Sequence, residues 1–360
     1  MLKVGIFTPY VRNEVTLAAT QFADWLIRCG IDVVMLSSSK IESGIHRIWD
    51  HKVRRATNKT AIYSWAYGAT HLCWFEADMA ALKQSQLVAI GNSKISTQNY
   101  YFPYWARQTD ACRHFTACAD RVICLNRDLF HWLCRLDPGK VRDLNKVTTY
   151  VNLMSPGRLI LAKDGKVTEG QTRLLAVLPK ATKRDLGIGV LGVFKSLLQR
   201  HPSLAMTVLI ESSLPCNYRT QLAKMRQQYG ERLSVVTGLP YYGYSDLARQ
   251  HDWVYVANTR HLFGSLLSTL NASSVPLVCH DLPPVGAHVG DKHNGVLIPC
   301  NLLGEEMPVA DVDLSVVFKY LDCVVSEPEI SLMALQLTGA EYLKQRQAYF
   351  EQFIYKEFVQ

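Results

Sequence analysis

Residues 252–298 restrict the fold of this chain more than any other segment does. Two short runs of apolar and β-branched residues, 253–256 and 277–279, have the length of buried strands. Between them a segment with helical spacing, 266–273, ends shortly before Pro276. A strand, a helix and a second strand within about thirty residues predict a βαβ unit, which requires a parallel sheet.

The corner between the first strand and the helix is the first candidate for a ligand site. In open parallel sheets, ligands bind outside the carboxyl ends of the strands, and helix N-termini at that edge favour anions. His261 and Ser265 lie at this corner, where the helix begins. The sequence therefore predicts that an anionic ligand binds around residues 261–265.

The same residues resemble the donor-binding segment of GT-B glycosyltransferases, in particular the large retaining family four. The family pattern is Glu-Gly-Phe-Gly, then a helix that carries a second Glu, then small residues and a Pro. Aligning Phe263 and Gly264 with the Phe-Gly of the family places Pro276 on its Pro, and residues 294–297 match its Asn-Gly strand. His261 and Thr269 stand where the family has its two glutamates.

The resemblance implies what these residues do. The helix entrance, formed by Phe263, Gly264 and Ser265, is expected to hold the donor. Thr269 is expected to bond the ribose hydroxyl groups, and His261 is expected to touch the sugar or the phosphate as a catalytic residue. A lone histidine is as often merely structural, so both interpretations of His261 stay open.

The fold implied is an α/β GT-B fold, in which two Rossmann-like domains face each other across a cleft. The 360 residues are enough for two domains. We expect a first domain over 1–155, a polar linker over 156–171, a second domain over 172–338, and a C-terminal helix over 339–360 that packs back on the first domain. Strands are predicted at 174–178, 206–210 and 233–236, and a helix at 187–200.

The composition indicates the cellular compartment in which the protein is expected. No run of apolar residues is long enough for a membrane-spanning helix, and the chain starts directly with a predicted strand rather than a signal peptide. The ten cysteines form no Cys-x-x-Cys pair and mostly lie in apolar surroundings. They indicate reduced core residues in a cytoplasmic protein, in the cytoplasm of the host cell if a phage encodes it.

The first residues predict another βαβ unit, with strands at 3–7 and 31–36 and a helix at 16–30. Residues 30–33 keep the second half of the pattern that opens a GT-B domain. Asn13 and Glu14 occupy the loop in which the family has Gly-Gly, so the resemblance implies that they lie near the donor. A Gly-x-Gly-x-x-Gly motif is absent, which argues against a dehydrogenase.

Two carboxylates follow a third predicted strand, 72–75, and further strands are expected at 87–90 and 121–126. Glu76 and Asp78 lie just past the carboxyl end of 72–75. An inverting transferase needs one carboxylate there as the general base for the acceptor hydroxyl. The alternative is that one of them caps the next helix.

A basic pair follows the first strand of the second domain. Lys183 and Arg184 stand two residues and one residue before the position of the family's lysine, and the resemblance implies that they hold the donor pyrophosphate. Surface charge is the alternative. No histidine, cysteine and carboxylate cluster has the spacing of a metal site, so no metal and no cofactor beyond the nucleotide-sugar, with UDP the expected nucleotide, is predicted.

The positive charge is confined to the first half of the chain. Residues 1–170 carry 22 Lys and Arg against 14 Asp and Glu, whereas 171–360 carry 17 of each, so the first half holds the whole net charge of +8. Such asymmetry suggests that one domain meets a polyanion or an anionic surface.

Two stretches are candidates for acceptor binding. The basic stretch 44–60 is either a solvated helix face or a contact for phosphates or an anionic membrane. The aromatic stretch 99–105 is either a core plug or a surface that stacks on a sugar or base. The candidate acceptor residues are Arg47, Lys52, Arg54, Arg55, Tyr101, Trp105 and Arg107.

The sequence therefore predicts a glycosyltransferase that uses a nucleotide-sugar and an anionic acceptor. Residues 24–27 and 30–33 weakly resemble the phage DNA α-glucosyltransferases, which favours a hydroxymethylated pyrimidine in duplex DNA as the acceptor. A polysaccharide or lipid-linked glycan at the inner membrane surface explains the basic stretch equally well. A catalytically silent GT-B scaffold is the third alternative, because both family glutamates are missing.

Overall fold

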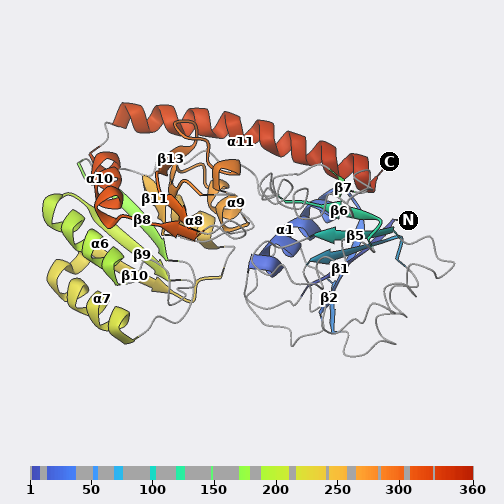
Figure 1. The fold of residues 1–360 in the computed structure, drawn as a ribbon, viewed down its shortest axis with the longest axis horizontal. Helices are drawn as coiled ribbons and strands as arrows, with labels where there is room; N and C mark the ends of the chain where they lie inside the picture. The colour runs from blue at the N-terminus through green and yellow to red at the C-terminus, as the bar shows by residue number, and fades with distance from the viewer. Residues whose placement is uncertain are drawn as a thin grey trace. The chain divides into compact units, whose positions relative to one another are not determined.

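The computed structural model divides the chain into two compact units (Figure 1). Unit 1 comprises Met1–Gly157, Leu262–Leu266 and Arg346–Gln360, and unit 2 comprises Arg158–His261 and Leu267–Gln345. The residues that the structure describes are 2–8, 14–37, 52–55, 69–75, 98–102, 119–125, 147–148, 170–178, 188–210, 216–240, 243–257, 265–282, 285–303, 309–326 and 329–359. The predicted linker 156–171 and the predicted strand 87–90 lie almost wholly outside these residues.

Unit 1 is built on a parallel sheet of seven strands in the order β3-β2-β1-β4-β5-β6-β7. Its central strand β1 is buried from Val4 to Phe7, because β-branched and aromatic side chains cover both faces. The strands are β1 (Lys3–Phe7), β2 (Asp32–Ser37), β3 (Lys52–Arg55), β4 (His71–Phe75), β5 (Gln98–Phe102), β6 (Arg121–Ile123) and β7 (Val147–Thr148). The strands predicted at 3–7, 31–36 and 72–75 are confirmed, and the strand predicted at 121–126 is confirmed over 121–123.

Aromatic rings fill the core of unit 1. Phe7 and Trp74 are register partners on β1 and β4, and their rings stack with centroids 4.0 Å apart. Phe75 and Phe102 repeat this arrangement on β4 and β5 at 4.1 Å. The edge of Phe102 contacts Phe22 of helix α1 (Glu14–Arg28) at 4.9 Å. Ring stacking between neighbouring strands therefore fixes the packing of this helix on the sheet.

Two segments of unit 1 differ from the sequence-based expectation. The aromatic stretch contains strand β5, which the sequence reading missed because Pro103 and the dense aromatics suggested a plug between elements. The basic stretch contains strand β3, which pairs with β2, so the interpretation of 44–60 as a helix is wrong for residues 52–55. Alternating Lys, Val and Arg suits an edge strand, where charged side chains remain in water.

Unit 2 repeats the strand order of unit 1 with a parallel sheet β10-β9-β8-β11-β12-β13. Its strands are β8 (Arg173–Leu178), β9 (Ala205–Ile210), β10 (Leu233–Thr237), β11 (Trp253–Val256), β12 (Leu277–His280) and β13 (Gly295–Ile298). All six strands predicted for this half are confirmed. Continuous apolar runs explain this success, since a parallel strand covered on both faces shows no alternation.

The remaining elements of unit 2 are helices, two short 3₁₀ segments and a hairpin. Helix α6 (Gly189–Arg200) packs on α10, and Gly189 allows this because a Cβ there would lie 2.4 Å from Leu314 Cδ1. The others are α7 (Cys216–Tyr229), α8 (Tyr244–Ala248), α10 (Leu314–Val325), the 3₁₀ segments Gly230–Arg232 and Val285–Ala287, and the antiparallel pair β14 (Asn301–Leu303) and β15 (Val309–Asp311). Helix α9 (Ser265–Asn271) belongs to unit 2 from Leu267 onward, and its first two residues belong to unit 1.

The last helix, α11 (Glu329–Phe358), belongs to unit 2 up to Gln345 and to unit 1 from Arg346 onward. In unit 2, the Tyr342 ring stacks on His293 with centroids 5.8 Å apart. In unit 1, Phe350 contacts Trp25 at 5.5 Å and Phe358 contacts Phe22 at 5.4 Å. The prediction that a C-terminal helix returns to the first domain is confirmed, although the helix begins at 329 rather than 339.

Candidate functional site

The strand order identifies one edge of the second sheet as the candidate site. From β8 the chain continues to β9 and β10 on one side, and then returns to place β11 on the other side of β8. Ligands of open α/β sheets bind at the carboxyl ends of the strands on either side of such a reversal. Val177 and Val256 are register partners there, and the Ala257 amide donates to the Val177 carbonyl at 3.0 Å.

The two predicted donor loops leave from these neighbouring strand ends. The loop after β8 carries Lys183 and Arg184, and the loop after β11 carries His261, Phe263 and Gly264. All five side chains lie outside the described residues. The topology nevertheless starts both loops at adjacent strands, so both predicted segments leave the sheet from the same edge.

Two helix N-termini follow these loops without a neutralising acid. Helix α6 begins at Gly189, and α9 begins at Ser265, whose side chain is not described. Neither helix has an acidic residue in its first turn, and the N-cap residue of α6, Ile188, makes no side-chain hydrogen bond. Within the described residues, the partial positive charge of both helix ends therefore favours an anion.

A buried polar pair lies beneath this edge. The Tyr255 hydroxyl and His280 Nε2 are 3.3 Å apart, and the ring of Phe194 from α6 meets the Tyr255 ring edge-on at 6.2 Å. Burial raises the pKa of Tyr255 far above its ordinary value, and the neighbouring Cys279 adds to the shift. The phenol therefore stays protonated, and its contacts link α6, β11 and β12.

Thr269 lies on the buried face of α9, with only 2% of its surface exposed. Contact with a ribose, as the resemblance implied, would require this side chain to become accessible. The same helix ends at Asn271, whose side chain is held in a polar network that the sequence analysis did not identify.

This network joins α9 to the loop before β13. Asn294 Nδ2 donates to Asn271 Oδ1 at 3.1 Å and to the His288 carbonyl at 3.0 Å, while its Oδ1 accepts from the Gly290 amide at 2.7 Å. Gly295 follows at a point where a Cβ would lie 2.1 Å from the Leu277 carbonyl oxygen. The Asn-Gly pair on which the resemblance rests therefore positions the start of β13, because Asn294 makes these hydrogen bonds and Gly295 permits the close approach to Leu277.

The first sheet contains a similar reversal between β1 and β4. Asn13 lies outside the described residues, and Glu14 is the first residue of α1, with an undescribed side chain. Glu76 and Asp78 lie just beyond β4, also outside the described residues. The segments that carry these candidates leave the sheet from neighbouring strands, because Phe7 and Trp74 are register partners.

The acceptor candidates have different environments. Lys52 is exposed on β3 and forms an ion pair with Asp32 at 2.8 Å. Arg54 and Arg55 belong to the same strand, but their side chains are not described. Arg47, Trp105 and Arg107 lie outside the described residues.

Tyr101 requires a correction. Its side chain is 0% exposed in the middle of β5, so it cannot offer its ring to a base or sugar in this conformation. Tyrosine in a central strand satisfies the strong β-propensity of aromatic residues by packing inside. Of the two interpretations of the aromatic stretch, the described part supports the core.

Within the described ranges, no group of three or more histidine, cysteine or acidic residues is arranged to hold a metal ion. The helices of the described chain also include none with enough length and apolar content to cross a membrane.

No known family model and no curated protein matches this sequence. Solved structures match it over nearly the whole chain. Sucrose-phosphate synthase from Thermosynechococcus elongatus is 13% identical with a TM-score of 0.66, and 100% of each chain is covered. HepE of Anabaena, solved with UDP and glucose, is 11% identical with a TM-score of 0.65 over 99% of each chain.

An alpha-glucosyltransferase solved with UDP and a 13-mer DNA containing a HMU base is similar to the same degree, with 11% identity and a TM-score of 0.64 over 98% of each chain. At such identities the likeness establishes the fold and leaves the reaction open. Together with the two parallel sheets of matching strand order, it shows that this chain has the GT-B fold, made of two Rossmann-like domains.

Proposed function

We propose that this chain is a glycosyltransferase that moves a sugar from a nucleotide-sugar, with UDP as the expected nucleotide, to an anionic acceptor. The observation that carries the proposal is the pairing of β8 with β11. It brings together the starts of the two loops that hold the basic pair and the His261 corner, and each loop leads into a helix N-terminus without acidic residues.

The chemistry of such a site is the stabilisation of a leaving diphosphate. Cleavage of the sugar–phosphate bond leaves negative charge on the nucleoside diphosphate. Lys183 and Arg184 supply positive charge to that group, and the first turns of α6 and α9 supply backbone N–H donors. Preorganised donors of this kind lower the barrier without a bound metal.

The catalytic roles follow from the position of each loop. Asp78 or Glu76, just past β4, would accept the proton of the acceptor hydroxyl as the general base if the reaction inverts the sugar. His261 would contact the sugar or its phosphate from the second domain. A retaining reaction needs no such base, so substitution of both Asp78 and Glu76 tests whether the reaction depends on one.

For the acceptor, we propose a hydroxymethylated pyrimidine in duplex DNA. Residues 1–170, which include the first domain, carry the whole excess of positive charge, as a phosphate-binding surface requires. A protein of the same fold, the alpha-glucosyltransferase, was solved with DNA that contains a HMU base. An enzyme that modifies a base must extract it from the stack, and residues just beyond β5, such as Trp105, are the remaining aromatic candidates for holding it.

The donor half of the proposal is tested with a panel of nucleotide-sugars. We expect one donor to be slowly hydrolysed to free nucleotide, also in the presence of EDTA. Replacing both Lys183 and Arg184 by alanine should lower this rate by at least about tenfold, since each charge-assisted contact contributes about 1.5–3 kcal/mol. Lys195→Ala, exposed on α6, is the matched control. Failure to bind any nucleotide would leave only the silent scaffold.

The acceptor half is tested by offering three acceptors with that donor. Duplex DNA containing hydroxymethylated pyrimidines should gain the mass of one sugar per modified base, and unmodified DNA of the same sequence should gain none. A lipid-linked or polysaccharide acceptor glycosylated instead of DNA would reject the DNA assignment while leaving the glycosyltransferase intact.

A further inference from the structure

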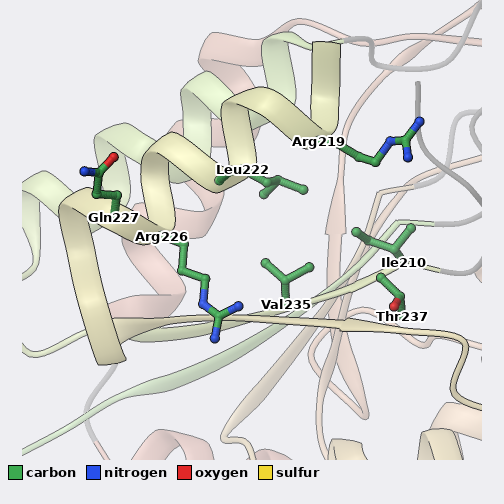
Figure 2. Close-up of a pocket in the computed structure, with 8 residues that line it drawn as sticks. Ile210, Arg219, Leu222, Arg226, Gln227, Val235 and Thr237 are labelled. Carbon is green, nitrogen blue, oxygen red and sulfur yellow. The ribbon is translucent and has the colours of Figure 1, made fainter. Parts of the chain in front are cut away.

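A hollow of about 470 Å³ lies in unit 2, on the side of β8 that carries β9 and β10 rather than on the side of β11. Helix α7 forms one wall, and the ends of strands β9 and β10 form the other (Figure 2). Its floor consists of Ile210, Leu222 and Val235, and its lining is mostly apolar. The volume falls within the range of natural ligand sites.

Two guanidinium groups flank the apolar floor. Arg219 and Arg226 are both exposed and lie seven residues apart, so their Cα atoms are about 10 Å apart along the helix. Figure 2 shows Arg226 reaching from α7 toward β10, and Arg219 at the other end beside Ile210 and Thr237. Within the described part of the chain, neither guanidinium has a hydrogen bond or an ion pair.

The charge of this helix has one sign. Helix α7 contains Arg219, Lys224 and Arg226 and no acidic residue. The lining of the hollow contains no acidic residue either. Along the groove, a cation is therefore followed by the apolar floor and then by a second cation. Among the described residues, no acidic side chain of the protein neutralises these two charges.

The groove also runs beside an edge strand. Among the strands that the structure describes, β10 is the last of its sheet and pairs with β9 alone. The helix of a βαβ crossover runs roughly antiparallel to its strands, so the groove follows β10. An extended peptide can pair with such an edge through its main chain while its side chains enter the groove.

We propose that this groove binds an extended acidic peptide segment in which one apolar residue lies between two acidic residues on the same face. Side chains on one face of a strand repeat every ~6.8 Å, so two carboxylates on either side of an apolar residue span about 13 Å. Two long arginine side chains can reach such carboxylates. The site extends beyond the proposed sugar transfer and provides a means of docking the enzyme on an acidic partner.

The proposal is tested with the fluorescein-labelled peptide Gly-Glu-Thr-Leu-Thr-Glu-Gly and the full chain. We expect saturable binding at low ionic strength. Arg219→Gln and Arg226→Gln should each raise Kd about threefold, and the double variant about tenfold, as exposed ion pairs permit. Lys224→Gln on the same helix, which removes the same charge outside the groove, is the matched control and should change Kd less than twofold.

Two further readouts separate this site from non-specific charge. Methyl resonances of Leu222 and Val235 should shift on peptide addition, and replacing the peptide leucine by serine should weaken binding. Equal binding of a peptide with Gln for Glu, or equal loss with Lys224→Gln, would overturn the proposal. Two other results would also overturn it. One is that decyl phosphate binds, the peptide does not, and this binding is weakened by the same arginine substitutions. The other is that the chain forms a dimer in solution and Arg226→Gln dissociates it.

Discussion

The two domains share one strand order but fill it with different chemistry. In unit 1 the core consists of stacked aromatic rings on neighbouring strands, such as Phe7 on Trp74 and Phe75 on Phe102. In unit 2 the core consists mainly of leucine, valine and isoleucine from the sheet and from α6 and α10. The strand order therefore does not determine which side chains fill the core, since unit 1 uses stacked aromatic rings and unit 2 uses mainly aliphatic side chains.

The difference extends to how each domain is completed. Residues 15–26 of α1 are buried on every face, and part of this burial comes from Phe350 and Phe358 at the end of α11. Helix α6 keeps an ordinary exposed face with Lys195 and Gln199. Unit 1 thus depends on a distant segment of chain for its core, whereas the α6 region of unit 2 does not.

The largest expected effect comes from removing that distant support. Phe350→Ala and Phe358→Ala should each destabilise unit 1 by about 3–5 kcal/mol, because each leaves a cavity against α1. Hydrogen exchange read by mass spectrometry should show lost protection in α1 and β4 but not in β8 or β9. Tyr349→Ala, 57% exposed on the same helix, should change stability by less than about 0.5 kcal/mol. Equal loss of protection in both domains would contradict the comparison.

The second largest effect concerns unit 2. Gly295→Ala should destabilise it by about 1–3 kcal/mol, because the new Cβ would overlap the Leu277 carbonyl and must displace β12 or β13. Gly192→Ala on α6 is the counterpart, since nothing lies within 4 Å of its added Cβ and alanine favours the helix by about 1 kcal/mol. Chemical denaturation should show a lower free energy of unfolding for Gly295→Ala and a higher one for Gly192→Ala.

A smaller effect is expected from pH, and it should occur in both domains. Desolvation lowers the pKa of His71 in unit 1, and it does the same for His251 in unit 2. The unfolded chain therefore binds protons before the folded chain as the pH falls below the ordinary pKa of histidine. Stability should decline over this window and level off below the folded pKa.

The pH effect is assigned by substitution. His71→Phe should reduce the pH dependence of unit 1 unfolding, and His251→Asn that of unit 2, each without affecting the other domain. If the free energy of unfolding rose as the pH fell below the ordinary pKa of histidine, the pKa values of these histidines would be raised in the folded state rather than lowered.

The smallest effect on stability concerns the basic edge strand. Lys52→Ala removes an exposed ion pair with Asp32 and should cost less than about 1 kcal/mol. If β3 contacts DNA phosphates, the same variant should lower the slope of log K against log salt by about 0.9. An unchanged slope would remove Lys52 from the acceptor surface.

Most strands of unit 2 could be predicted from sequence because their residues form largely apolar runs, although β10 also contains Ser234 and Thr237. β11, with Trp253–Val256, is buried at every position, so its length and composition were sufficient. Helix α7 was missed because its polar residues give only a weak apolar stripe, formed by Tyr218, Leu222 and Met225. Strand β5 was missed because aromatic residues next to a proline fit a loop as well as a strand.

The candidate site could be predicted only as a set of loops. The sequence placed Lys183 and His261 after two strands, and the strand order then showed that these strands are neighbours. Burial was not predictable, since nothing in the sequence separates Tyr101 inside the sheet from an aromatic residue at the surface. Networks such as Asn271 with Asn294 also escaped, because they join residues through space rather than by spacing.

The return of α11 has a consequence for biosynthesis. A ribosome makes α1 early, but the rings that cover its outer face belong to the last helix of the chain. Unit 2 can begin to fold while translation continues, as domains commonly do. The N-terminal domain cannot complete its core until Phe350 and Phe358 have left the ribosome, which happens only after every strand of the second sheet has been made.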